Sequence, residues 1–90
     1  ANPIEVATSC IHAQVPKDMK VSVVKAREVI SNCAPQLDAW SRFSIEGSFK
    51  RSFDESDPQM AIAFSKHRNA SQAYWLNLLS DEYVPSSQKL

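Results

Sequence analysis

The side chains of this chain that most readily do chemistry are its two cysteines and two histidines: Cys10, His12, Cys33 and His67. A structural zinc site takes about four ligands, and these four residues are all the Cys and His that the sequence contains. His12 follows Cys10 by two residues, so on a helix the two side chains point to different sides. A redox dithiol usually has Cys-x-x-Cys spacing, which is absent. The sequence therefore predicts no metal and no cofactor, and favours a structural disulfide.

The other polar motifs do not add up to a catalytic site. General acid–base catalysis needs a base with a suitable pKa beside a nucleophile or a second carboxylate. His67 lies in the basic stretch "SKHRN", which is typical of a solvated helix face, and His12 is expected to be a partly buried helix residue. The acidic run at 54–57 lacks the glycine and the ligand spacing of a calcium loop. One glycine cannot form a glycine-rich phosphate loop. We therefore expect no catalytic residue and no enzyme activity.

A stretch rich in aromatic and basic residues remains, "RFSIEGSFKRSF" at 42–53. A domain of this size buries only a limited number of large side chains, so some aromatic residues should reach the surface. The predicted partner-binding residues are Arg42, Phe43, Phe49, Lys50, Arg51 and Phe53. The alternative is that these aromatic residues simply pack beneath the last helix.

The elements that must position these residues are helices. In "NPIE", Asn2 is a helix cap, Pro3 suits the first helical position and Glu5 completes a capping box. Apolar residues recur at 4, 7 and 11 and at 6, 10 and 13, which predicts one buried face. Because the residue before Pro16 avoids helical geometry, the helix should end near Gln14.

The strongest apolar periodicity follows, with spacings of three and four. Its members are Val23, Ala26, Ile30, Cys33, Leu37 and Trp40. Ser22 is the expected cap of this helix. Pro35 predicts either a kink or two end-to-end helices. Gly47 is expected to end the helix in a left-handed conformation.

A polar connection then leads to Asp57-Pro58, a second cap-then-proline start. The apolar residues that follow predict a helix that extends toward Tyr83, either continuous or broken at 65–72. No segment alternates as a half-buried strand does. The predicted fold is all-α, a small bundle of three to four helices in a single domain over residues 1–90, with a flexible tail at about 84–90.

Whether the two cysteines can form a disulfide depends on how the two predicted helices are connected. Cys10 and Cys33 both lie on inward faces, and a bridge needs Cα atoms within about 7 Å. The midpoint between the two cysteines lies between Val21 and Ser22. A bridge therefore requires that residues 15–21 form a loop. If a helix instead ran from Pro16, the cysteines would be offset and would be free thiols in the core.

The composition of the chain indicates which classes of partner and which cell compartment to expect. Lys plus Arg and Asp plus Glu number 10 each, so no overall charge recruits nucleic acid or an anionic membrane. No apolar run approaches the roughly 20 residues of a membrane span. The start "ANP" is consistent with a chain from which a signal peptide has been removed, and a disulfide fits the same oxidising environment. We expect a periplasmic or secreted protein.

The function expected from these features is binding to another protein, as an inhibitor, immunity protein or adaptor would do. The design, an exported helical scaffold with one disulfide, is similar to that of small periplasmic immunity proteins of bacteria, although no motif matches a particular family. The alternative is a structural subunit whose apolar seam at 23–40 also forms a homo-oligomer.

Overall fold

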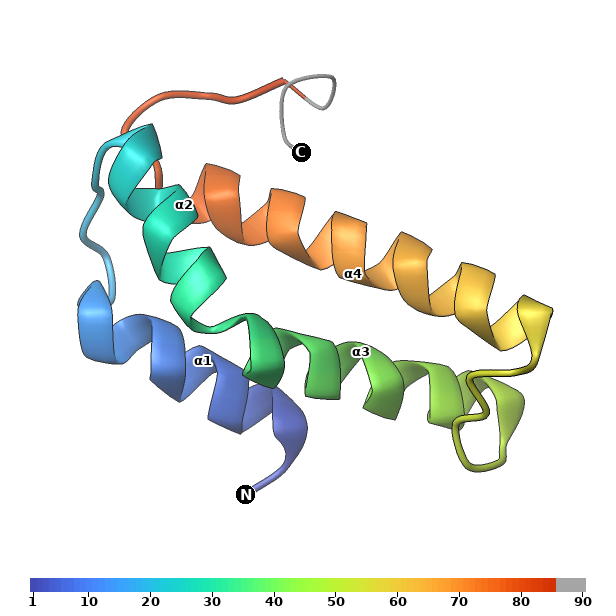
Figure 1. Cartoon of the computed structure of the whole chain (residues 1–90). Coiled ribbons are helices and arrows are strands. Elements are labelled where there is room, and N and C mark those ends of the chain that lie inside the picture. The colour runs from blue at the N-terminus through green and yellow to red at the C-terminus, as the bar shows by residue number, and fades with distance from the viewer. Residues whose placement is uncertain (86–90) are drawn as a thin grey trace.

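The computed structural model of the chain describes residues 1–85, in which four helices follow one another (Figure 1). They are α1 (Pro3–Gln14), α2 (Val23–Asn32), α3 (Ala34–Phe49) and α4 (Pro58–Leu79). The extended contacts found in the described residues amount to one isolated bridge between Val21 and Ser80. The predicted all-α fold is confirmed.

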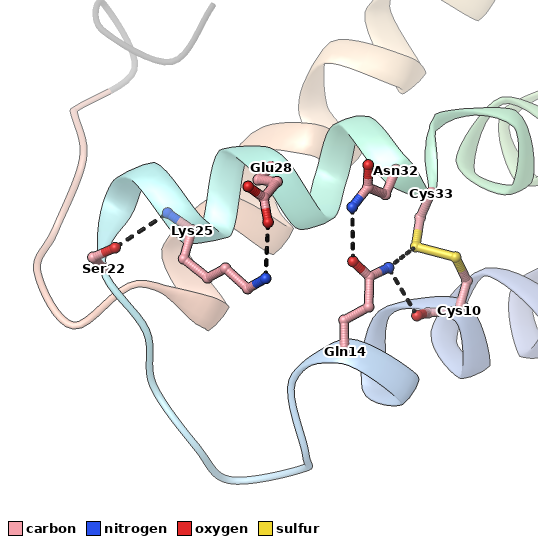
Figure 2. Close-up of polar contacts among 7 residues, drawn as sticks. All are labelled: Cys10, Gln14, Ser22, Lys25, Glu28, Asn32 and Cys33. Carbon is pink, nitrogen blue, oxygen red and sulfur yellow. Dashed lines mark hydrogen bonds and ion pairs between the residues drawn. A yellow bond between two sulfur atoms is a disulfide. The ribbon is translucent and has the colours of Figure 1, made fainter.

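The helix starts follow from local sequence. The Asn2 side chain accepts a hydrogen bond from the Glu5 backbone N–H at 2.9 Å, and Pro3 occupies the first helical position. Ser22 Oγ accepts from the Lys25 N–H at 3.1 Å (Figure 2). Asp57 Oδ1 accepts from the Gln59 N–H at 2.9 Å. Each bond satisfies a backbone donor that the first turn of a helix leaves free, so the three predicted starts are confirmed.

Pro35 divides the long apolar seam into two end-to-end helices. Cys33 lies between them with φ −102° and ψ 12°, and Pro35 falls in the first turn of α3, where its missing N–H costs nothing. The seam keeps its phase across the break, because Ala26, Ile30, Cys33 and Leu37 are all buried. The expectation of a kinked helix or two helices is therefore met by two helices.

The helices are arranged unevenly along the molecule, which measures 38 × 32 × 17 Å. α3 and α4 lie side by side and antiparallel, while α1 and α2 cover only the end of this pair that lies away from the α3–α4 connection (Figure 1). The main core draws on Leu37 from α3 and on Trp75, Leu76 and Leu79 from α4. The other half of the pair, which we call the hairpin tip (residues 41–68), therefore consists of α3, α4 and their connection, and neither α1 nor α2 covers it.

The end of α3 differs from expectation. Gly47 is helical and exposed, and the left-handed residue is Lys50, with φ 57°. The helix continues because Ile45 and Phe49 follow buried Ser41 at a spacing of four residues, so they extend the same face toward α4. The prediction that Gly47 ends the helix was wrong.

The last helix also differs from expectation, since α4 is continuous through 65–72 and ends at Leu79 rather than near Tyr83. Beyond it, Val21 N–H donates to Leu79 O and Asp81 N–H donates to Val21 O, each at 2.8 Å. Val84 is 4% exposed and joins the main core, so it does not belong to the tail expected from residue 84 onward. Residues 86–90 of that expected tail lie outside the described part.

The buried face of α1 is narrower than its apolar pattern suggested. Ala7 and Ile11 are fully buried, whereas Ile4 and Val6 remain 38% and 44% exposed. α1 packs on α2 and α3 at one edge of the flat molecule, so only part of its apolar stripe finds a partner.

Candidate functional site

The two cysteines form the predicted disulfide. Their Cα atoms are 6.0 Å apart, and the bridge links the third turn of α1 to the residue between α2 and α3. Gln14 lies over the bridge: its Nε2 donates to Cys33 Sγ at 3.2 Å, and its Oε1 accepts from Asn32 Nδ2 at 2.9 Å (Figure 2). Both thiols are consumed in a structural cross-link.

The loop that the disulfide required is present between Gln14 and Val23. The Val21 bridge to the end of α4 holds its last part, and Lys20 Nζ donates to the Leu78 carbonyl oxygen. These contacts hold the loop that follows α1 against the C-terminal end of α4.

The structure places His67 differently from the solvated position that its basic neighbours suggested. Its Nδ1 lies 2.8 Å from the hydroxyl of Ser41, and its ring meets the Trp40 ring edge-on at 6.2 Å between centroids. Ser41 is 0% exposed, so a substrate cannot reach its hydroxyl. The Ser41–His67 pair is therefore a packing contact between α3 and α4. Sequence reasoning missed it because the two residues are 26 positions apart on separate helices.

His12 is partly buried, as predicted. Its Nδ1 is 3.0 Å from the Val15 carbonyl oxygen, and its ring lies edge-on to Trp75 at 5.9 Å. In the part of the chain that the structure describes, no three His, Cys, Asp or Glu side chains gather as a metal site would need.

The predicted partner-binding residues lie in the second half of α3 and in the connection that follows it. Phe43 is 47% exposed, while Phe49 and Phe53 are half-buried. The Arg51 guanidinium lies 5.6 Å from the Phe49 ring centroid and also pairs with Asp57. Lys50 is exposed. The alternative expectation holds in part for Phe53, because its ring packs on Phe64 of α4 with centroids 5.6 Å apart.

Two residues of α4 complete this surface, and sequence reasoning missed both. Phe64 lies 5.8 Å from the guanidinium carbon of Arg42 and 5.5 Å from that of Arg68. The stretch "SKHRN" contains Arg68, but no local signal places Arg68 or Phe64 beside Arg42, because the antiparallel pairing of α3 with α4 brings them together. We call the combined set the arginine–aromatic surface; its members are Arg42, Phe43, Phe49, Arg51, Phe53, Phe64 and Arg68.

Two hollows indent the hairpin tip near these residues. The smaller has a volume of about 190 Å³ and is lined by Arg42, Phe53, Glu55, Ala61, Phe64 and Ser65. The larger has a volume of about 460 Å³ and is lined by Phe43, Ser44, Glu46, Gly47, Arg51 and Ser52. Aromatic rings and guanidinium groups thus border concave surface at the tip.

Several carboxylates near this surface already have partners. Hydrogen bonding from Arg51 and from the Gln59 N–H holds the pKa of Asp57 below its ordinary value. The Ser56 hydroxyl and N–H do the same for the pKa of Asp54. Glu46 Oε2 accepts from the Phe53 N–H at 2.9 Å. Among residues 1–85, neither Arg42 nor Arg68 forms an ion pair.

Comparison of the chain with models of known protein families, with curated proteins and with solved structures finds no match. The described helices include none that is long and apolar enough to cross a membrane.

Proposed function

We propose that this chain is a small exported protein that acts by binding another protein through its arginine–aromatic surface, as an inhibitor, immunity protein or adaptor does. The observation that carries the proposal is the composition of the hairpin tip. The tip is formed by α3, α4 and their connection (Figure 1). Its phenylalanine side chains are exposed or half-buried, and three guanidinium groups lie 5.5–5.8 Å from the centroids of two of those rings.

The chemistry of this surface supports protein binding. Arginine and aromatic side chains are the types most enriched at the energetic centres of protein interfaces, since they combine large apolar area with directed hydrogen bonds. Five of the seven residues of the surface lie on α3 or α4, so their approximate position is fixed before a partner arrives. Such preorganisation lowers the entropic cost of association.

The disulfide supports the proposed export. Disulfides persist in oxidising compartments such as the periplasm and the extracellular space, and they are rare in the cytosol. The bridge joins residues 23 positions apart in a chain with a small core, which is where a cross-link stabilises most usefully.

A homo-oligomeric structural subunit is the second candidate function. The seam at 23–40 does not favour it, because most of the seam is already buried within one chain. The exposed apolar residues of α4, Ile62 at 56% and Tyr74 at 59%, supply a different surface for self-association. A molar mass that rises with concentration would favour this candidate.

The test of protein binding is site-specific photo-crosslinking in the source cells. A benzophenone amino acid replaces Phe43, and in the control it replaces Val24 of α2, which is 79% exposed and remote in sequence from the tip. We expect a discrete crosslinked product at position 43 that is absent at position 24 and is lost with Arg42→Glu. Equal products at both positions, or none at position 43, would refute the proposal.

A further inference from the structure

We infer that the larger hollow of the hairpin tip receives a tyrosine or tryptophan side chain of the partner protein, seated above Gly47. This inference rests on the proposed function and names the group by which the partner is anchored.

The hollow lies where α3 passes into the connection that leads to α4. Its volume is about 460 Å³, which falls within the range of roughly 300–1,000 Å³ that is usual for binding pockets. Gly47 lines it together with Phe43, one helical turn earlier, and with Arg51 of the connection. Phe43 and the Arg51 side chain are each 47% exposed, so a partner can reach both.

Gly47 gives the first argument, because nothing else in the described residues calls for a glycine at this position. Its φ is not positive, so its backbone conformation suits any residue of a helix. No atom lies within 4 Å of a Cβ added there, so close packing does not require glycine either. Glycine destabilises a helix relative to alanine. What the missing side chain does provide is space in the hollow.

The second argument is the chemistry of Phe43 and Arg51. An aromatic ring attracts another ring in an edge-on or offset arrangement, and a guanidinium plane stacks on a ring. The Arg51 guanidinium already pairs with Asp57 and lies 5.6 Å from the Phe49 ring centroid, so it is held in place before a partner arrives. An aliphatic side chain could fill the hollow, but it would use neither the ring interaction nor the cation. The complementary group is therefore aromatic.

The polar residues of the hollow favour tyrosine or tryptophan over phenylalanine. Ser44 and Ser52 line it, and neither hydroxyl has a hydrogen-bond partner among residues 1–85. A tyrosine O–H or a tryptophan N–H needs such a partner when it is buried. Glu46 also lines the hollow, so one carboxylate and the Arg51 guanidinium are both present and disfavour an occupant of either charge.

The probes are the capped amino acids N-acetyl-tyrosinamide and N-acetyl-tryptophanamide, titrated in the millimolar range into isotope-labelled full-length protein and followed by NMR. The matched probes are the phenylalanine and leucine analogues. We expect the tyrosine and tryptophan probes to shift the amide signals of Gly47 and Ser52 saturably. The leucine probe should bind at least about threefold more weakly, and the phenylalanine probe about twofold more weakly.

Three variants separate filling of the hollow from a general effect on the protein. Gly47→Leu places a side chain in the hollow and should weaken the tyrosine probe at least about tenfold. Its urea midpoint should not fall, since leucine favours a helix more than glycine does. Ser48→Leu adds the same side chain at the neighbouring exposed residue, which does not line the hollow, and should leave the affinity within about twofold. Arg51→Lys keeps the charge but loses the planar group, and should weaken the probe about threefold.

Several outcomes would overturn the inference. They are absence of saturable shifts at Gly47, a phenylalanine or leucine probe that binds as tightly as the tyrosine probe, or equal effects of Gly47→Leu and Ser48→Leu. Signals of the hollow that move with protein concentration alone would also overturn it, because a second copy of the chain would then be the occupant.

The proposed function fails separately, through the Phe43 crosslinking experiment. A crosslinked partner together with inactive aromatic probes would retain protein binding and reject the aromatic anchor. If both hold, Gly47→Leu should also lower the yield of the position 43 product, whereas Ser48→Leu should not.

Discussion

The disulfide from Cys10 ends at Cys33, the single residue that separates α2 from α3. The cross-link therefore holds α1 against the point where the chain changes direction. Cys33 is itself fully buried and belongs to the main core, so the bridge and the apolar packing act on the same place.

We predict that Cys10→Ala combined with Cys33→Ala lowers the free energy of unfolding by about 2–4 kcal/mol, because the unfolded chain regains the freedom that the closed loop denied it. Urea unfolding at neutral pH measures the change. Wild-type protein kept in reductant is the control and should approach the stability of the double variant. An unchanged urea midpoint in both samples would contradict this account of the bridge.

The Ser41–His67 contact gives a second prediction. Ser41→Ala removes the hydroxyl that lies 2.8 Å from His67 Nδ1, and it should cost about 1–2 kcal/mol of unfolding free energy, since a partly buried polar group loses its partner. Ser48→Ala, at an exposed position of α3, should change stability by no more than about 0.5 kcal/mol. A double-mutant cycle with His67→Phe should give a coupling of about 1 kcal/mol. Zero coupling would show that the contact contributes nothing.

The third prediction concerns the segment after α4. Asn77 Oδ1 accepts from the Val84 N–H at 2.7 Å, and Asn77 Nδ2 donates to the Val84 carbonyl oxygen at 3.1 Å. One amide side chain thus holds residue 84 in the core. Asn77→Ala should accelerate hydrogen exchange at the Val84 amide about tenfold, because loss of the two hydrogen bonds together costs about 1.4 kcal/mol or more.

The control for this prediction is Asn69→Ala, at an exposed position of the same helix. It should leave exchange at Val84 unchanged. Equal exchange rates in the Asn77 variant and the wild type would mean that apolar burial alone holds the segment.

The fourth prediction is the pH dependence of the hairpin tip. The hydrogen bond from Arg51 lowers the pKa of Asp57 below its ordinary value of 3.8. A carboxyl group whose pKa is lower in the folded state stabilises that state above the unfolded pKa, and this contribution disappears as the pH falls through the folded pKa. The start of α4 should therefore remain capped at neutral pH and loosen only in acid below the usual carboxyl range.

An NMR titration of the Asp57 carboxyl measures this directly. Its midpoint should lie below 3.8 in the wild type and should rise in Arg51→Gln. Arg42→Gln removes a guanidinium of the same surface that does not bond Asp57, so it should leave the midpoint nearly unchanged. A midpoint that ignores Arg51→Gln would reject the assigned cause.

Local signals in the sequence predicted those parts of the fold that local chemistry decides. The caps at Asn2, Ser22 and Asp57, and the interruption at Pro35, each depend on residues within four positions, and each is found where it was expected. The disulfide was predictable as well, because inward helix faces and a loop at 15–21 were enough to bring the two cysteines together.

Contacts between residues that are far apart in the sequence could not be predicted from those local signals. The sequence marked Arg42 and Phe53 as surface candidates, but nothing near Phe64 or Arg68 indicated that α4 would bring them to the same place. The stretch "SKHRN" suggested a solvated histidine for the same reason, since the buried serine that binds His67 lies on another helix. Tertiary pairing, not local propensity, decides these positions.

The end of α3 provides the last prediction, because the chain has its only glycine in the helix and a lysine in the left-handed position. Glycine costs about 0.5–1 kcal/mol relative to alanine inside a helix, and no atom lies within 4 Å of a Cβ added at Gly47. Gly47→Ala should therefore stabilise the protein by about that amount. Lys50 has φ 57°, a conformation that glycine adopts without the steric cost of a Cβ.

Lys50→Gly should accordingly stabilise the protein by up to about 1 kcal/mol, measured by urea unfolding. Lys50→Ala is the matched control: it also removes the ammonium group but keeps the Cβ, so it should give no such gain. The two stabilising changes lie three residues apart in one turn, and their sum must be checked in the double variant. If Lys50→Gly is no more stable than Lys50→Ala, the left-handed backbone at residue 50 carries no strain, and packing of Phe49 alone determines where α3 ends.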